Sequence, residues 1–112
     1  MVRQYRYDKR TDTVVARPGW VWHCPARVHP DDPRLTDEQW QAIAERLMHA
    51  TGIAQAGCRW IAVRHADDHL HLVASLVSEQ TGRRVEPFRD FLALRQECRA
   101  IERDLGLVET AR

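Results

Sequence analysis

The fold is set by one stretch near the middle of the chain, Arg59–Val77, with the sequence RWIAVRHADDHLHLVASLV. On both sides of a short acidic break, Ala66-Asp67-Asp68, β-branched and apolar residues alternate with other residues. Alternation with a period of two predicts strands, and a polar break between two such runs predicts a turn. The stretch is therefore predicted to form a β-hairpin.

Three histidines are predicted to lie on one face of this hairpin. If Ala66-Asp67-Asp68 form the loop, His65 pairs with His69 and Val63 pairs with His71. Directly opposed residues of antiparallel strands point to the same face, as do residues two apart on one strand. The three imidazoles therefore converge. The other face, predicted to face the core, collects Trp60, Ala62, Leu70, Leu72, Ala74 and Leu76.

Such a cluster has the chemistry of a metal site. Neighbouring imidazoles lower each other's pKa, because like charges at short range repel. Neutral imidazole nitrogens directed at one centre are good ligands for a divalent ion, and Asp67 and Asp68 lie on the adjacent turn. A His-x-His pair alone more often marks surface histidines at a strand end, but a third histidine in register favours metal. We therefore interpret His65, His69 and His71 as metal ligands.

The length of 112 residues predicts one domain over residues 1–112, with an N-terminal strand or hairpin segment at 1–16 and a core at 19–107. Its 44% apolar and 29% charged residues are typical of globular proteins. A net charge of +1 does not by itself indicate nucleic-acid binding. Because no signal peptide or transmembrane-length apolar run is recognised, we expect a cytoplasmic protein that does not contact a membrane.

The three cysteines, Cys24, Cys58 and Cys98, are far apart and odd in number. They form no Cys-x-x-Cys pair, so neither a zinc knuckle nor a disulfide framework is predicted. We expect reduced, buried thiols.

Two strand-like runs, Val2–Tyr7 and Thr13–Ala16, flank a polar turn and predict an N-terminal hairpin. A third strand is predicted at Trp20–Cys24, in which Val21 and His23 share one face and Trp20, Trp22 and Cys24 the other. Two interpretations of His23 remain open. It is either a hydrogen-bonded structural histidine or a further member of the histidine cluster from a neighbouring strand.

Two helices complete the pattern. One is predicted to begin after Thr36, which forms a capping-box pattern with Gln39, and to end at Gly52. The other is predicted to begin at Pro87 and to end at Gly106. Its apolar stripe advances by three and four residues and consists of Phe91, Leu94, Cys98, Ile101 and Leu105.

The predicted order is strand, helix, strand, strand, helix, preceded by further strand material. This order fits an α+β fold with an antiparallel sheet and helices on one face, a ferredoxin-like (β)βαββα layer. The histidine hairpin is expected to lie centrally in the sheet, with its outward face free for chemistry.

The stretch Val63–Val73 resembles the three-histidine motif of relaxases, the mobilization nucleases of the His-hydrophobic-His (HUH) endonuclease superfamily. The similarity extends from Val21–Cys24 through the capped helix to Arg95–Arg99, as in relaxase domains of actinobacterial plasmids and integrative elements. The motif is specific in its full form and weak as His-x-His alone.

The resemblance implies a metal-dependent endonuclease that nicks single-stranded DNA during plasmid mobilization and conjugation. A tyrosine attacks the scissile phosphate and leaves a 5′-phosphotyrosine link and a free 3′-hydroxyl. By resemblance His69 and His71 hold Mg²⁺ or Mn²⁺ with His65 as the third ligand, and Asp67 orients a histidine from outside the ligand set.

The resemblance also implies that arginines hold the DNA strand through its phosphates. The arginines assigned to nucleic-acid binding are Arg64, Arg59, Arg3 and Arg6. Other relaxosome proteins are implied as further partners, and an exposed N-terminal edge strand leaves a homodimer open.

The departure from the relaxase pattern concerns the nucleophile. In relaxases the tyrosine lies in a longer segment before the strand that corresponds to Trp20–Cys24, and here the only tyrosines are Tyr5 and Tyr7. One alternative is that Tyr7 or Tyr5 serves as the nucleophile. The others are a truncated or minimal member that binds metal and DNA without a covalent intermediate, and a tyrosine supplied by a second polypeptide.

Two other functions remain open at this point. One is a non-catalytic single-strand nucleic-acid-binding or regulatory module of the same fold, which would bind irrespective of chelation. The other is a metal-dependent phosphodiesterase that uses water as its nucleophile. A covalent protein–DNA adduct belongs to the tyrosine nickase alone.

Overall fold

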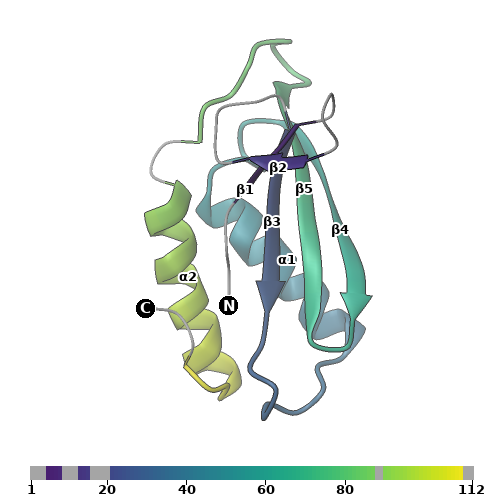
Figure 1. The fold of residues 1–112 in the computed structure, drawn as a ribbon. Helices are drawn as coiled ribbons and strands as arrows, with labels where there is room; N and C mark the ends of the chain where they lie inside the picture. Colours follow the sequence, from purple (N-terminus) through teal and green to yellow (C-terminus); the bar gives the residue numbers. More distant parts are fainter. Residues whose placement is uncertain (1–4, 9–12, 16–20, 88–89, 110–112) are drawn as a thin grey trace.

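A computed structural model describes residues 5–8, 13–15, 21–87 and 90–109 of the chain (Figure 1). The elements, in chain order, are strands β1 (Tyr5–Asp8), β2 (Thr13–Val15) and β3 (Val21–Arg27), helix α1 (Asp37–Ala50), strands β4 (Cys58–Ala66) and β5 (His69–Ser78), and helix α2 (Asp90–Leu105).

The strands form one antiparallel sheet in the order β2-β1-β3-β5-β4. Helices α1 and α2 pack beside each other and share one hydrophobic core with the sheet (Figure 1). The predicted α+β fold is confirmed. The predicted central position of the hairpin is wrong. Of its two strands β5 is an inner strand, but β4 forms an edge of the sheet in the described part of the chain.

The hairpin itself is confirmed, with a shorter loop than predicted. Val63 pairs with His71 as expected, but Ala66 rather than His65 lies opposite His69. The loop therefore consists of Asp67 and Asp68, and the register shifts between Arg64 and Ala66. His65 is the extra residue of a β-bulge, a feature that alternation of apolar residues does not reveal.

The N-terminal hairpin is also confirmed, since β1 pairs with β2 from Arg6↔Val15 to Asp8↔Thr13. On its other side β1 pairs with β3 at Tyr5↔His23. The ends of the two predicted runs, residues 2–4 and 16, lie outside the described residues.

Strand β3 runs past its predicted end at Cys24 and includes Pro25. Proline lacks a backbone N–H and is tolerated where a strand has a neighbour on one side only. In the described ladders β1 pairs only with Trp22 and His23 of β3, whereas β5 pairs with β3 along its whole length. Pro25 therefore lies beyond the part of β3 that β1 covers.

Helix α1 follows the prediction closely. The Thr36 hydroxyl accepts a hydrogen bond from the Gln39 backbone N–H at 3.1 Å, and the Gln39 side chain accepts one from the Thr36 N–H at 2.8 Å. Gly52, just after the helix, has a positive φ of 79°, a conformation that glycine adopts without strain. The capping box and the glycine stop are both confirmed.

Helix α2 begins at Asp90, whereas the prediction placed its start at Pro87, and residues 88–89 lie outside the described part of the chain. Leu94, Cys98 and Ile101 are buried as predicted. Leu105, in the last turn, is 37% exposed, so the apolar stripe ends one position earlier than its spacing indicates. The side chain of Phe91 is outside the described residues.

The core lies between the sheet and the two helices. All three cysteines are buried, as predicted, and burial raises the pKa of the Cys98 thiol to about 12. No helix within the described residues combines the length and the apolar content needed to cross a membrane. The largest fully buried side chains are Trp22, Ile43, Leu47, Met48, Ile53, Leu72, Leu76, Leu94 and Ile101.

We expect Thr36→Ala to lower the free energy of unfolding by about 1 kcal/mol, because the backbone N–H of Gln39 loses its acceptor. The matched control is Thr36→Ser, which keeps the hydroxyl. Urea unfolding of the three proteins measures the difference. An equal loss in both variants would assign the effect to the threonine methyl group instead of the cap.

Candidate metal centre

His65, His69 and His71 converge as predicted. Each offers one ring nitrogen, and these three atoms lie within 4.8 Å of one another. The ring centroids are 4.8 Å apart for His65 and His69, 5.4 Å for His65 and His71, and 5.6 Å for His69 and His71. The bulge in β4 does not separate the rings, since a bulge re-aims the side chain that it carries. Three nitrogens at this spacing can bind a single metal ion together.

The cluster lies at the turn end of the hairpin. His65 is exposed, and His69 and His71 are half-buried. Burial lowers the pKa of His71, and the nearby His69, His65 and Arg27 lower it further. This direction favours the neutral imidazole, which is the form that binds a metal ion.

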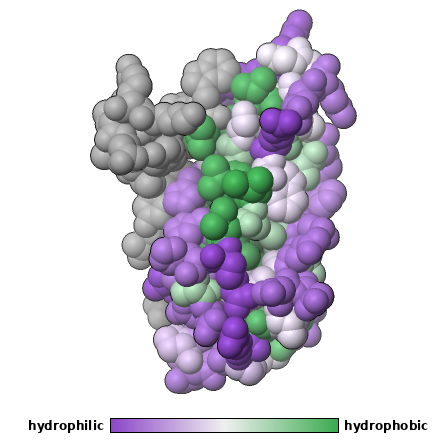
Figure 2. All heavy atoms as spheres, turned by 90° about the vertical axis from the view of Figure 1, so that its right-hand side faces the viewer, coloured by the Kyte–Doolittle hydropathy of each residue, from purple (hydrophilic) through white to green (hydrophobic). Residues whose placement is uncertain are grey.

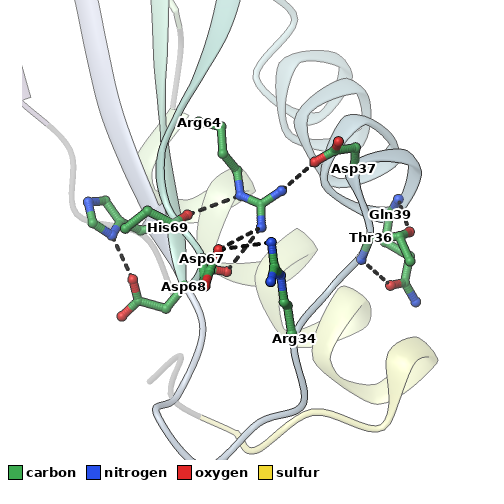
Figure 3. Close-up of polar contacts among 9 residues, drawn as sticks. Arg34, Thr36, Asp37, Gln39, Arg64, Asp67, Asp68 and His69 are labelled. Atoms are coloured by element: carbon green, nitrogen blue, oxygen red, sulfur yellow. Dashed lines mark hydrogen bonds and ion pairs between the residues drawn. The ribbon is translucent and has the colours of Figure 1, made fainter.

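The turn supplies an acceptor that orients His69. The Nδ1 of His69 lies 2.8 Å from Oδ1 of Asp68, so the Nδ1–H donates to the carboxylate (Figure 3). The same hydrogen bond lowers the pKa of the Asp68 carboxyl. Because Nδ1 of His69 is hydrogen-bonded to Asp68, Nε2 remains available to bind a metal ion.

Asp67 makes different contacts from those that the resemblance implies. Its carboxylate lies 3.3 Å from Nη2 of Arg34 and 3.8 Å from Nη2 of Arg64 (Figure 3). The carboxylate that reaches a cluster histidine is that of Asp68, and not that of Asp67 as the resemblance implied. The two aspartates are adjacent, and only the geometry of the tight turn decides which of them faces the rings.

His23 contacts the cluster from β3. Its Nε2 lies 2.8 Å from Nδ1 of His71, and the two rings are stacked with centroids 4.9 Å apart and planes 14° from parallel. Burial lowers the pKa of His23, and the neighbouring His71 lowers it further. Both interpretations of His23 therefore hold in part. It is a hydrogen-bonded histidine, and its partner, His71, is a member of the cluster.

Comparison with models of protein families shows the family of the chain. The model of the family described as relaxase, MobA/VirD2-like, nuclease domain, matches residues 4–107. The chain belongs to this family. No curated protein and no solved structure gives a significant match to it.

In this relaxase domain the two tyrosines lie on β1, next to the strand that carries His23. Tyr5 is paired with His23 in the β1–β3 ladder, whereas Tyr7 is paired with Val14 on the far side of β1. The side chains of Tyr5 and Tyr7 are not among those that the structure describes. By backbone register, Tyr5 is therefore the tyrosine that lies directly opposite His23.

Arg64, assigned to nucleic-acid binding, points to the helix side of the sheet. Its guanidinium donates to Asp37 of α1 and, at 3.0 Å, to the carbonyl of Ala66 (Figure 3). It also lies 5.5 Å from the centre of the Trp40 ring, a cation–π contact. These contacts connect the histidine turn to α1, on the face opposite the cluster.

The other assigned arginines lie away from the cluster or outside the described residues. Arg59 is 80% exposed, pairs with Glu79 at 3.3 Å and lies at the opposite end of the hairpin from the histidines. Arg3 and the Arg6 side chain lie outside the described residues. Arg27, which was not predicted from the sequence, is exposed and paired with His69 at the end of β3. Arg27 could have been found only by extending the predicted third strand through Pro25, because this extension brings Arg27 beside the cluster.

An apolar strip continues from the cluster along the same face of the relaxase sheet. Ile61 and Val63 of β4 are 60% and 48% exposed, and they pair with Val73 and His71 of β5. Opposed residues share a face, so both lie on the histidine side. Figure 2, which faces the side of the molecule where β4 forms the edge, shows hydrophobic side chains gathered in a band with hydrophilic ones around it.

We expect Arg64→Ala to lower the free energy of unfolding by about 1 kcal/mol, because its hydrogen bonds and its contact with Trp40 join the hairpin to α1. The matched control on the same strand is Arg59→Ala, whose exposed ion pair contributes less than about 0.5 kcal/mol. Urea unfolding measures both. Weaker binding of single-stranded DNA by Arg64→Ala at unchanged stability would instead support the nucleic-acid role.

Proposed function

We propose that this relaxase domain is a metal-dependent endonuclease that nicks single-stranded DNA in the mobilization of plasmids or conjugative elements. The observation that carries the proposal is the three-histidine cluster on the open face of the sheet, in a chain that belongs to the relaxase nuclease family. Because such an enzyme acts where mobile DNA is present, the proposal includes a cytoplasmic location. Other relaxosome proteins, and a second copy of the chain, are proposed as its partners.

The donor atoms fit a divalent ion. His65, His69 and His71 would hold it, and Asp68 would fix the orientation of His69. Imidazole nitrogens suit transition metals better than Mg²⁺, so Mn²⁺ fits this donor set better of the two predicted ions. A bound divalent ion would polarise the scissile phosphate and offset the negative charge that develops in the transition state.

The chain's own residues supply the remaining parts of the reaction. A tyrosine hydroxyl attacks the phosphorus, the bond to the 3′ oxygen breaks, and a 5′-phosphotyrosine and a 3′-hydroxyl result. The register of β1 with β3 favours Tyr5 over Tyr7 for this attack. Arg27 is placed to attract a phosphate group, and the apolar edges of Ile61 and Val63 suit contact with unstacked bases.

The test is incubation of the domain with a diverse pool of labelled single-stranded oligonucleotides and Mn²⁺, with and without chelator, read on a denaturing protein gel. We expect a shifted band that requires metal, because the tyrosine remains linked to DNA. The double variant His69→Ala/His71→Ala is expected to abolish it. Tyr5→Phe is expected to abolish the band and Tyr7→Phe to retain it, since each removes one hydroxyl and little else.

The other outcomes separate the alternatives. Released DNA fragments without a shifted band, unaffected by either tyrosine variant, would assign the reaction to water as the nucleophile. Binding of oligonucleotides that is insensitive to chelator, with no product, would make the domain a binding module. A band that persists in Tyr5→Phe but disappears in Tyr7→Phe would reverse the assignment of the nucleophile.

We expect Asp68→Ala to weaken Mn²⁺ binding by about 10- to 100-fold, because His69 loses the acceptor that fixes its ring. The neighbouring variant Asp67→Ala removes the same chemical group from the same turn and is expected to have a smaller effect. Isothermal titration calorimetry measures both affinities. The reverse order of the two effects would return the orienting function to Asp67.

A further inference from the structure

We propose that His23 is a positioning residue that holds His71 in the Nδ1–H tautomer, so that Nε2 of His71 faces the metal centre. The inference rests on the proposed function, because it assumes that His71 is a ligand. It assigns a purpose to a fourth histidine that lies outside the three-histidine motif and on a different strand.

The contact follows from the pairing of β3 with β5. His23 is paired with Val73, and Pro25 is paired with His71, so His23 and His71 are diagonal neighbours on one face. Their nitrogens, Nε2 of His23 and Nδ1 of His71, are 2.8 Å apart, a distance that requires one proton between them. The near-parallel rings, 14° apart, limit rotation of the His71 ring.

The position of that proton decides whether His71 can bind a metal ion. If His23 donated, the neutral His71 ring would carry its own proton on Nε2 and that nitrogen would have no lone pair. If His71 donates from Nδ1, Nε2 keeps its lone pair and can be a ligand. Since Nδ1 already contacts His23, the second arrangement is the only one in which a neutral His71 ligates.

Asp68 plays the same part for His69, since it accepts a hydrogen bond from Nδ1 of that ring, but its acceptor is a carboxylate. The partner of His69 lies on an exposed turn, where a carboxylate stays hydrated. The partner of His71 is half-buried on the sheet, where a charged carboxylate would pay a desolvation penalty. A neutral imidazole acceptor fixes the ring at that position without adding a buried charge.

The experiment combines the tautomer state of the metal-free protein with its affinity for Mn²⁺. Long-range ¹H–¹⁵N correlation spectra distinguish a protonated Nδ1 from a protonated Nε2 in each histidine ring. Calorimetry measures Mn²⁺ binding. The variants are His23→Leu, which removes the acceptor, His23→Gln, whose side-chain oxygen replaces it, and His49→Leu, a control at an exposed histidine in the last turn of α1.

In the wild-type protein and in His23→Gln we expect His71 to carry its proton on Nδ1. In His23→Leu we expect the proton to move to Nε2 and Mn²⁺ to bind about 10- to 100-fold more weakly. His23→Gln and His49→Leu are expected to bind close to the wild-type level. If His23→Leu does not fold, the proton position on His71 in the wild-type protein and in His23→Gln still tests the inference.

Two results would overturn the inference. One is a wild-type His71 ring protonated on Nε2, and the other is unchanged Mn²⁺ affinity in a folded His23→Leu protein. Failure of the proposed function looks different. If the wild-type protein binds no Mn²⁺ but the spectra show the Nδ1 proton of His71 lost in His23→Leu, the hydrogen bond is established and the metal assignment fails.

Discussion

The antiparallel pairing of β5 with a strand on each side is the constraint on which the rest of this molecule depends. It sets His69 and His71 on β5, places Val63 of β4 opposite His71, and brings His23 of β3 diagonally against the same ring. Side chains alternate along a strand, so a slip of one residue would exchange the two faces. The register that buries Leu70 and Leu72 is the one that places the imidazoles on the opposite face of the sheet.

Burial enforces that register. Leu70, Leu72, Ala74 and Leu76 of β5 are at most 2% exposed and pack in one core with both helices. Exchanging the faces would expose these four side chains, at a cost of roughly 1.5 to 3 kcal/mol for each leucine. The chemistry of the open face is therefore stabilised by packing on the hidden face, and the site needs no contacts of its own to define the strand register.

Much of this was predictable from the sequence, because the determining signals are local. The alternation around the acidic break predicted the hairpin and the convergence of its three histidines, and the pattern from Thr36 to Gln39 predicted the start of α1. These features depend on residues within a few positions of one another. The family resemblance rested on the same local motif, and the match over residues 4–107 confirms it.

What escaped prediction depends on partners far away in the sequence or on the detailed geometry of a turn. Nothing local distinguishes an inner strand from an edge strand, so the position of β4 was missed. The bulge at His65 shortens the loop, and the shorter loop determines that Asp68 rather than Asp67 reaches His69. Arg64 was assigned to DNA from its place beside the motif, although Asp37 and Trp40, from a distant helix, determine where it points.

The site also shows why a hairpin alone is an incomplete metal centre. The motif supplies ligand nitrogens, but an imidazole ring is useful only when its other nitrogen is committed. His69 obtains its acceptor from the neighbouring residue, so the hairpin is self-sufficient there. The Nδ1 of His71 finds its partner, His23, on another strand, 48 residues earlier in the chain. Assembly of β3 onto β5 is thus the step that gives His71 its partner, and the complete geometry is a property of the folded sheet.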